Sequence, residues 1–227
     1  MPKLDYTIWM LNDVLPDALF TYQPYDIQKF LQKKNCFLAD YCIDDKPYAD
    51  WLDEYSKLKN INPKQTLTNL QKEQSIIGMK AIPPDKILNR ALGYGMTDSG
   101  DITSLYGFKT QNVGEIDQLS LDYDRYGSLR QPALNTPFPS RLVDDELLTV
   151  HPLNIFTSVL YKYTPWTGSP DSQYYAKWGT HGVYLFWTIW RTYWPEDLKQ
   201  YSHIDGSPAP VADVSNWLNP KPEGGKL

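Results

Sequence analysis

One aromatic stretch, Trp178–Trp194, constrains the fold of this chain more than any other part of the sequence. It contains half of the chain's eight tryptophans and its main run of apolar and aromatic residues. As a helix it would extend about 25 Å. A membrane-spanning helix normally needs about 20 apolar residues, whereas a shorter run is typical of a core helix or an interfacial helix. The fold therefore depends on whether this run contacts lipid, the protein's own core or a partner.

The composition of the stretch favours contact with a membrane. Aromatic residues lie near both of its ends, as in the aromatic belts of membrane proteins. Lys177 and Arg191 are long enough to carry their charges to the lipid headgroups. Soluble cores rarely place four tryptophans in one helix, because each indole N–H then needs a partner. We expect a single aromatic membrane-spanning helix over 178–195, with a buried or interfacial helix as the alternative.

The overall composition limits the possible classes of protein. The chain has 227 residues, enough for one good core or two small ones. Its net charge is −5, with 22 basic and 27 acidic residues mixed along the chain, so we expect no nucleic-acid partner. A mean hydropathy of −0.51 excludes a polytopic membrane protein. The 17 tyrosines and 18 prolines suit a chain that packs over partners, with a tyrosine-rich core as the alternative.

The first part of the chain has the pattern of short helices, and the predicted fold class is mainly α. An apolar stripe over 4–19 has helical spacing, although Pro16 should interrupt it. A second helix is predicted over 24–42. Further apolar segments begin just after a proline, as helices often do; these prolines are Pro47, Pro63 and Pro84. The sequence thus predicts a small helical lobe over 1–93.

The rest of the chain divides into four predicted segments. Frequent glycines over 94–150 predict an irregular, Pro/Gly/Tyr-rich segment that drapes over other surfaces, with at most a short helix or strand near 116–123. A short helix and a turn follow over 151–177. The aromatic helix then occupies 178–195, and a Pro-rich tail occupies 196–227.

No catalytic set of residues is apparent. The three histidines are far apart and none has a metal-ligand spacing. The acidic pairs Asp44–Asp45 and Asp144–Asp145 precede predicted helices or turns, where capping explains them. There is no P-loop and no Gly-x-Ser-x-Gly motif. We therefore expect no catalytic residue, cofactor, metal site or small-molecule substrate.

The run Leu185–Arg191 carries a resemblance to a known family. Its Phe-Trp-x-x-Trp-Arg core is followed by the acidic pair Glu196–Asp197 and by a tail that contains Pro208, Pro210 and Trp217. In these features the segment 178–218 resembles the AGGG subunit of the β subcomplex of mitochondrial NADH:ubiquinone oxidoreductase, or complex I. Members of that family are small, so the remainder of this chain would be a long N-terminal extension.

The resemblance implies an accessory, non-catalytic subunit of the mitochondrial inner membrane. Such a subunit binds no redox centre and braces the proton-pumping membrane arm, in contact with other subunits and with the lipid bilayer. The orientation in the membrane is not predicted, because positive charges on the two sides of the helix balance. The residues expected to form the membrane or partner anchor are Trp178, Phe186, Trp187, Trp190, Arg191 and Trp194.

Two other functions remain open from the sequence. The same aromatic and proline surplus would serve a soluble structural subunit of a viral or other large assembly. A soluble enzyme with a tryptophan-rich pocket is the third hypothesis. For the accessory role, Trp190→Ala or Arg191→Glu is expected to weaken incorporation into the complex, because buried aromatic and Arg anchors carry most interface energy.

Overall fold

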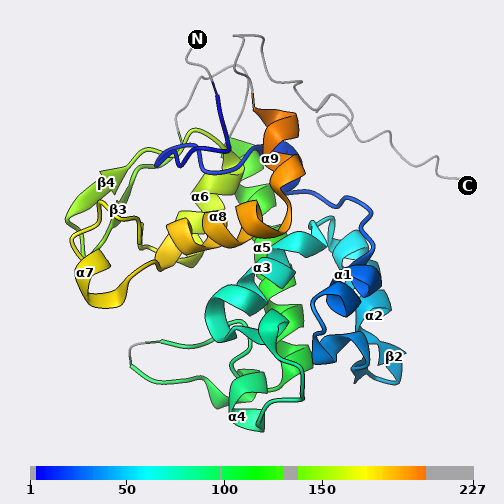
Figure 1. Cartoon of the computed structure of the whole chain (residues 1–227). Helices are drawn as coiled ribbons and strands as arrows, with labels where there is room; N and C mark the ends of the chain where they lie inside the picture. The colour runs from blue at the N-terminus through cyan, green and yellow to red at the C-terminus, as the bar shows by residue number, and fades with distance from the viewer. Residues whose placement is uncertain (1–3, 98, 130–137, 203–227) are drawn as a thin grey trace, which may run out of the picture.

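A mainly helical fold surrounds one central helix, which confirms the predicted fold class. The computed structural model describes residues 4–97, 99–129 and 138–202. The central helix is α3 (Pro63–Gln74), which contacts α2 (Tyr48–Lys59), α5 (Phe108–Leu129) and α8 (Gly182–Tyr193) (Figure 1). All residues of α3 from Pro63 to Leu70 are buried. The helix therefore lies inside the molecule, with neighbours on several sides.

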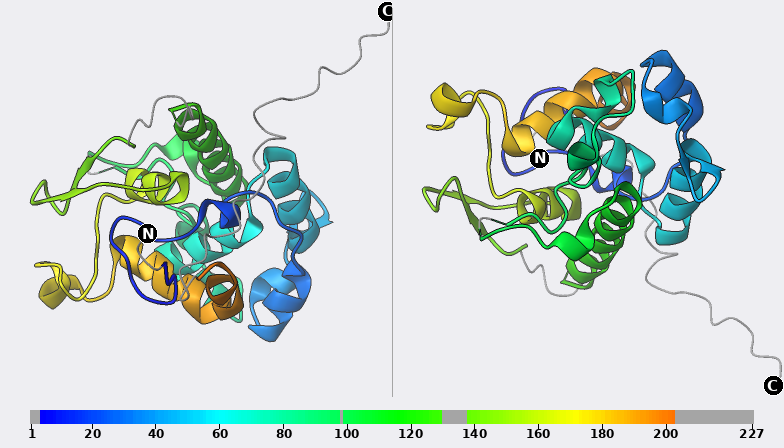
Figure 2. Two further views of the ribbon diagram at one scale, coloured as in Figure 1. Left: turned by 90° about the horizontal axis from the view of Figure 1, so that it is seen from above. Right: turned by 90° about the horizontal axis from the view of Figure 1, so that it is seen from below.

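The remaining elements are short and lie around this centre. The other helices are α1 (Ile27–Lys33), α4 (Asp85–Leu88), α6 (Ile155–Tyr163), α7 (Tyr175–Trp178) and α9 (Pro195–Tyr201). Single 3-10 turns are η1 (Asp17–Leu19), η2 (Phe37–Ala39), η3 (Ile76–Gly78) and η4 (Thr103–Leu105). Two antiparallel hairpins pair β1 (Cys42–Ile43) with β2 (Lys46–Pro47) and β3 (Arg141–Val143) with β4 (Leu148–Val150). Figure 2 shows α1 and α2 at one side of the molecule and the β3–β4 hairpin with α7 at the opposite side.

Proline and asparagine begin the helices as the sequence predicts. Pro63 is the first residue of α3, and the Asn62 side chain accepts a hydrogen bond from the Lys64 backbone N–H at 3.1 Å. Helices α2 and α4 begin directly after Pro47 and Pro84. The predicted helix within 151–177 is confirmed as α6.

The apolar stripe over 4–19 does not form a helix. Only η1 is helical there, and the rest of the segment runs over α6 and α8 in turns. The backbone groups find partners elsewhere in the molecule: Leu153 N–H donates to the Asn12 carbonyl at 2.8 Å, and Val14 N–H donates to Thr157 Oγ1 at 2.9 Å. Tertiary hydrogen bonds thus replace the helical ones.

The predicted helix over 24–42 is shorter in the structure. It divides into α1 and η2, and Asn35 takes a left-handed conformation between them with φ of 51°. Asparagine adopts this conformation more readily than most residues, so it suits the end of α1.

The described part of the segment 94–150 is not irregular throughout, because it contains α5, the longest helix of the described chain. Residues 98 and 130–137 of this segment lie outside the described part. Its glycines misled the prediction. At Gly114 the ring of Tyr94 lies against the helix, and a Cβ there would come within 2.2 Å of Tyr94 Cε1. This glycine therefore allows close packing and does not break the helix.

The segment 178–195 divides into two helices, which does not support the predicted spanning helix. Trp178 ends α7, Gly179 turns the chain with φ of 65°, and α8 has 12 residues. Within 4–97, 99–129 and 138–202, no helix has the length and apolar character needed to cross a membrane. The tail prediction is tested only as far as Ser202: α9 occupies its start, and residues 203–227 lie outside the described part.

Candidate active site

Four of the six predicted anchor residues lie in the protein's own core. Phe186, Trp187, Trp190 and Trp194 have exposed fractions of 1%, 2%, 0% and 6%. The ring of Phe156 on α6 meets Phe186 and Trp190 edge-on, with centroid distances of 6.1 and 5.8 Å. The aromatic face of α8 is thus occupied by α6 and α3.

The other two predicted anchors are exposed. Trp178 on α7 has an exposed fraction of 46%. Arg191 is exposed on α8, and its guanidinium lies 5.3 Å from the centre of the Trp187 ring. The structure therefore does not bring the six residues together into one surface.

The indole N–H groups show how a core can accept several tryptophans. Trp187 Nε1 donates to the Tyr6 carbonyl at 3.1 Å, and Trp194 Nε1 donates to the Tyr25 hydroxyl at 2.9 Å. The buried indole N–H of Trp190 has no partner among the described residues. Two of the three buried indoles are satisfied within the chain, which supports the core-helix alternative.

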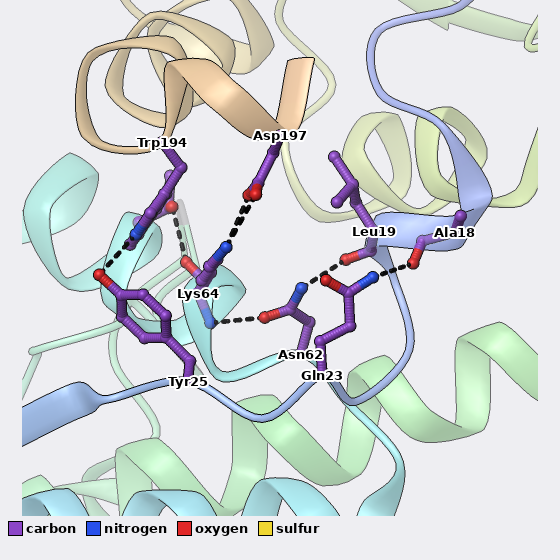
Figure 3. A network of polar contacts seen from close by, with 9 residues as sticks. Ala18, Leu19, Gln23, Tyr25, Asn62, Lys64, Trp194 and Asp197 are labelled. Carbon is purple, nitrogen blue, oxygen red and sulfur yellow. Dashed lines mark hydrogen bonds and ion pairs between the residues drawn. The ribbon is translucent and has the colours of Figure 1, made fainter. Parts of the chain in front are cut away.

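Trp194 belongs to a polar network that joins α3 to α9 (Figure 3). Lys64 Nζ forms an ion pair with Asp197 at 2.7 Å and lies 5.6 Å from the centre of the Trp194 ring. From the same end of α3, Asn62 Nδ2 donates to the Leu19 carbonyl at 3.0 Å. These groups satisfy one another, so the network holds the fold together and presents no free reactive group.

The opposite end of α3 presents the carboxyl of Glu73, which the sequence did not single out. The Glu73 side chain has an exposed fraction of 26%, and its Oε1 forms an ion pair with Lys72 Nζ. Lys72 Nζ also donates to Thr164 Oγ1 at 2.9 Å, at the end of α6. A carboxylate in the last turn of a helix lies at the unfavourable end of the helix dipole, at a cost of about 0.3–1 kcal/mol. The position of Glu73 is therefore not explained by helix stability.

A tight turn closes one side of the Glu73 carboxyl. Gly93 has φ of +69°, and a Cβ on it would lie 3.4 Å from Glu73 Oε2. The turn is fixed by Gln111 on α5, whose Oε1 accepts from the backbone N–H groups of Leu92 and Tyr94 at 3.3 and 3.1 Å. The carboxyl thus stands in a rigid frame made by α3, α5 and this turn.

A second carboxyl, Glu115 of α5, lies in the interior beside this site. Its side chain is buried, and its Oε1 accepts a hydrogen bond from Asn69 Nδ2, while Oε2 has no partner among the described residues. Burial raises the pKa of Glu115 to about 7, the Asn69 hydrogen bond opposes the rise, and the charge of Glu73 adds to it. Near neutral pH, Glu115 therefore exists partly in its protonated form.

Tyr163, at the end of α6, completes the surroundings of Glu73. Its hydroxyl donates to the Leu92 carbonyl, and Lys72 Nζ lies 5.0 Å from the centre of its ring. Burial raises the pKa of Tyr163 well above its usual range, and the charges of Glu115 and Glu73 add to this. The phenol thus stays protonated and holds the 92–95 turn in place.

Two surface cavities have linings that do not include Glu73. One, with a volume of about 570 Å³, is lined by residues of α1 and α2, including Asp26, Asp50 and Asp53. The other, of about 460 Å³, lies beside the β3–β4 hairpin.

Sequence reasoning missed this site for a physical reason. Glu115 and Tyr163 lie far from Glu73 in the chain, so only the fold brings them near. One signal was present in α3: Thr66, Asn69 and Glu73 follow the i, i+3, i+7 spacing of one helix face, in a helix that also carries Leu67 and Leu70. Polar residues on a buried helix face indicate a site or a polar network.

Comparison with known proteins gives no match to a family model, to a curated protein or to a solved structure. Within the described residues, no group of three or more His, Cys, Asp or Glu side chains is placed to hold a metal ion.

Proposed function

We propose that this protein is an enzyme that cleaves glycosidic bonds, with Glu73 as the catalytic acid. The observation that supports the proposal is the position of the Glu73 carboxyl, partly exposed at the last turn of α3 and framed by Lys72, Gly93 and Tyr163. This proposal departs from the sequence-based expectation that the chain has no catalytic residue.

The frame suits a carboxyl that transfers one proton. Glu73 in its acid form donates its proton to the oxygen of the leaving sugar as the bond from that oxygen to the anomeric carbon breaks. A water molecule forms the new bond to the anomeric carbon and gives up a proton to the Glu73 carboxylate, which restores the acid form. The carboxylate that results is stabilised by Lys72 Nζ, which Thr164 Oγ1 holds in place. The second carboxyl, Glu115, is buried beside this site, and its pKa is raised to about 7, chiefly by burial.

Glycosides are the favoured substrate class because their hydrolysis uses carboxyl side chains for proton transfer. The chain's net charge of −5 argues against a polyanionic substrate such as a nucleic acid.

The test is release of reducing ends from insoluble polysaccharides by the whole protein. A panel of chitin, cellulose, xylan and bacterial cell-wall peptidoglycan is incubated with the wild type and with Glu73→Gln, which keeps the shape and removes the acid. We expect cleavage of at least one polymer and a loss of at least about 100-fold in Glu73→Gln.

Glu54→Gln is the matched control, since Glu54 on α2 is an exposed carboxyl that forms an ion pair with Lys46 of β2. It should retain full activity. The proposal is wrong if wild type cleaves none of the polymers, or if Glu73→Gln cleaves as fast as Glu54→Gln.

The accessory-subunit role is a second candidate. It rests on the resemblance of 178–218 to the complex I subunit and on exposed apolar side chains at one end of the molecule, among them Leu142, Leu147 and Trp178. In this role the protein would be bound to the mitochondrial inner membrane through other subunits. Co-migration with NADH dehydrogenase activity on a native gel would support it, whereas migration apart from that activity would count against it.

A further inference from the structure

Beside the β3–β4 hairpin, a groove of about 460 Å³ combines an apolar wall with a polar wall. Trp9, Leu147 and Leu148 belong to the apolar side, while Ser169, Asp171 and Gln173 belong to the polar side. The groove shares no residue with the surroundings of Glu73.

The loop that supplies the polar wall is closed firmly at its base. Val183 N–H donates to the Trp166 carbonyl and Tyr184 N–H donates to the Thr167 carbonyl, both at 2.8 Å. The two backbone segments at the base, 166–168 and the start of α8, approach so closely that a Cβ on Gly182 would lie 2.2 Å from the Trp166 carbonyl oxygen. The segment 168–181 is therefore a compact surface loop with a fixed base, and loops of this kind are frequently functional.

The hairpin turn is tied to this loop through Asp144. Its carboxylate is buried and accepts hydrogen bonds from Thr167 N–H at 2.7 Å, from Thr167 Oγ1 at 2.6 Å and from Ser172 Oγ at 3.2 Å. Tyr174 extends the connection, since its hydroxyl donates to Asp145 Oδ2 at 2.7 Å. The two walls of the groove are thus held at a fixed separation.

Two of the polar side chains that line the groove are free to bind a ligand. Asp171 and Gln173 are exposed, and neither side chain forms a hydrogen bond or ion pair with another described residue. Asp144, in contrast, is fully engaged. An unpaired carboxylate and an unpaired amide beside an aromatic ring can accept and donate hydrogen bonds to a ligand that also has an apolar face.

The charge around the groove limits the class of ligand. The exposed acidic side chains there are Asp145, Glu146 and Asp171, which repel phosphates, anionic lipid headgroups and nucleic acid. A neutral sugar meets the remaining requirements, because its hydroxyls bind carboxylate and amide groups while the C–H face of its ring packs on an indole.

We propose that the groove between the β3–β4 hairpin and the 167–173 segment is a binding site for a neutral carbohydrate chain. Trp9 supplies the ring surface, and Asp171 and Gln173 bind the sugar hydroxyls. The site binds without cleaving, and it is independent of the proposed catalysis at Glu73.

The test is calorimetric titration of the whole protein with chitotetraose, cellotetraose and xylotetraose. We expect at least one of them to bind, and Asp171→Ala and Gln173→Ala each to weaken binding by about fivefold or more, as for loss of one hydrogen bond. Trp9→Phe keeps a ring in the core contact with Tyr184 and Trp187 and should weaken binding through the smaller surface. Leu121→Ala, at an exposed position of α5, is the control and should bind as wild type.

The outcomes separate the groove from the Glu73 site. Binding that Glu73→Gln retains and the groove variants lose supports the proposal, whether or not the protein cleaves polysaccharides. Absence of binding to all three sugars overturns it. Binding that persists in Asp171→Ala and Gln173→Ala also overturns it, because the sugar would then bind elsewhere.

Discussion

Two buried carboxyl groups give this protein an unusual dependence of stability on pH. Burial raises the pKa of Glu115 from 4.5 to about 7 and that of Asp13 from 3.8 to about 6. In both cases the folded state binds its proton more tightly than the unfolded chain does. The stabilisation is therefore complete below the unfolded pKa and is lost as the pH rises through the folded pKa.

We expect the free energy of unfolding to fall between about pH 4.5 and pH 7, with Glu115 contributing on the order of 3 kcal/mol. Glu115→Gln should flatten this part of the profile, since an amide does not titrate. Urea unfolding over pH 4–8 measures it. Asp13→Asn serves as a comparison, and it should flatten only the part of the stability profile below about pH 6. An unchanged profile in Glu115→Gln would contradict the assignment.

The structure changes the role assigned to Trp190. The sequence places it in an anchor for lipid or partners, but its ring is fully buried between α8 and α6. Trp190→Ala should reduce the free energy of unfolding by about 3–5 kcal/mol, because it leaves a large cavity. Arg191→Glu, at an exposed position, should cost only about 0.5–1 kcal/mol through loss of the contact with Trp187.

Chemical denaturation of the isolated protein distinguishes these two variants. If Trp190→Ala has the midpoint of wild type and loses only its association with other proteins, Trp190 is a partner anchor and the core role is wrong.

At the scale of elements, the close crossing at Gly168 and Gly182 fixes the loop beside the groove. A Cβ on Gly182, with φ of +60°, would lie 2.2 Å from a backbone carbonyl oxygen that cannot move aside. Gly182→Ala should therefore destabilise the fold by more than about 1 kcal/mol and loosen the 168–181 loop.

Gly78→Ala is the matched comparison for this variant. Gly78 has no atom within 4 Å of an added Cβ and no positive φ, so its replacement should leave the midpoint of thermal unfolding nearly unchanged. Limited proteolysis reports the state of the loop directly. Equal protease resistance in the two variants would show that the crossing does not hold the loop.

At the scale of the whole molecule, the N-terminal segment joins elements distant in the chain. Tyr6 N–H donates to Ser202 Oγ at 2.9 Å, and Tyr6 accepts the Trp187 indole N–H at its carbonyl. Val14 bonds to Thr157 in the same manner. The blue segment in Figure 1 accordingly lies beside α9, α8 and α6.

We expect cooperative unfolding in one transition, because a single core includes residues from the N-terminal segment, α3, α5, α6 and α8. Far-ultraviolet circular dichroism and tryptophan fluorescence should give the same midpoint in urea. Deletion of residues 1–20 should abolish the transition. Separate midpoints for the two probes would indicate independently stable parts.

The sequence by itself determined the helical class, the helix starts at proline and asparagine, and the helix within 151–177. These features depend on local chemistry: caps, fixed proline φ and apolar spacing act within a few residues. Only the tertiary structure decided the environment of the aromatic stretch. Its composition favoured lipid while its length allowed a core helix, and the positions of α3, α6 and the N-terminal segment place Phe186, Trp187 and Trp190 in the core.

The candidate site was decided entirely by tertiary structure. Glu73 is one of many charged residues in the sequence, and its setting depends on Glu115, Tyr163 and Gly93, which the fold brings to it from other elements. The same holds for α5, whose Gly114 suggested a break until Tyr94 was seen packed against it. Local signals specify where helices begin, whereas burial, and with it the chemistry of a carboxyl or an indole, is set by which distant residues surround it.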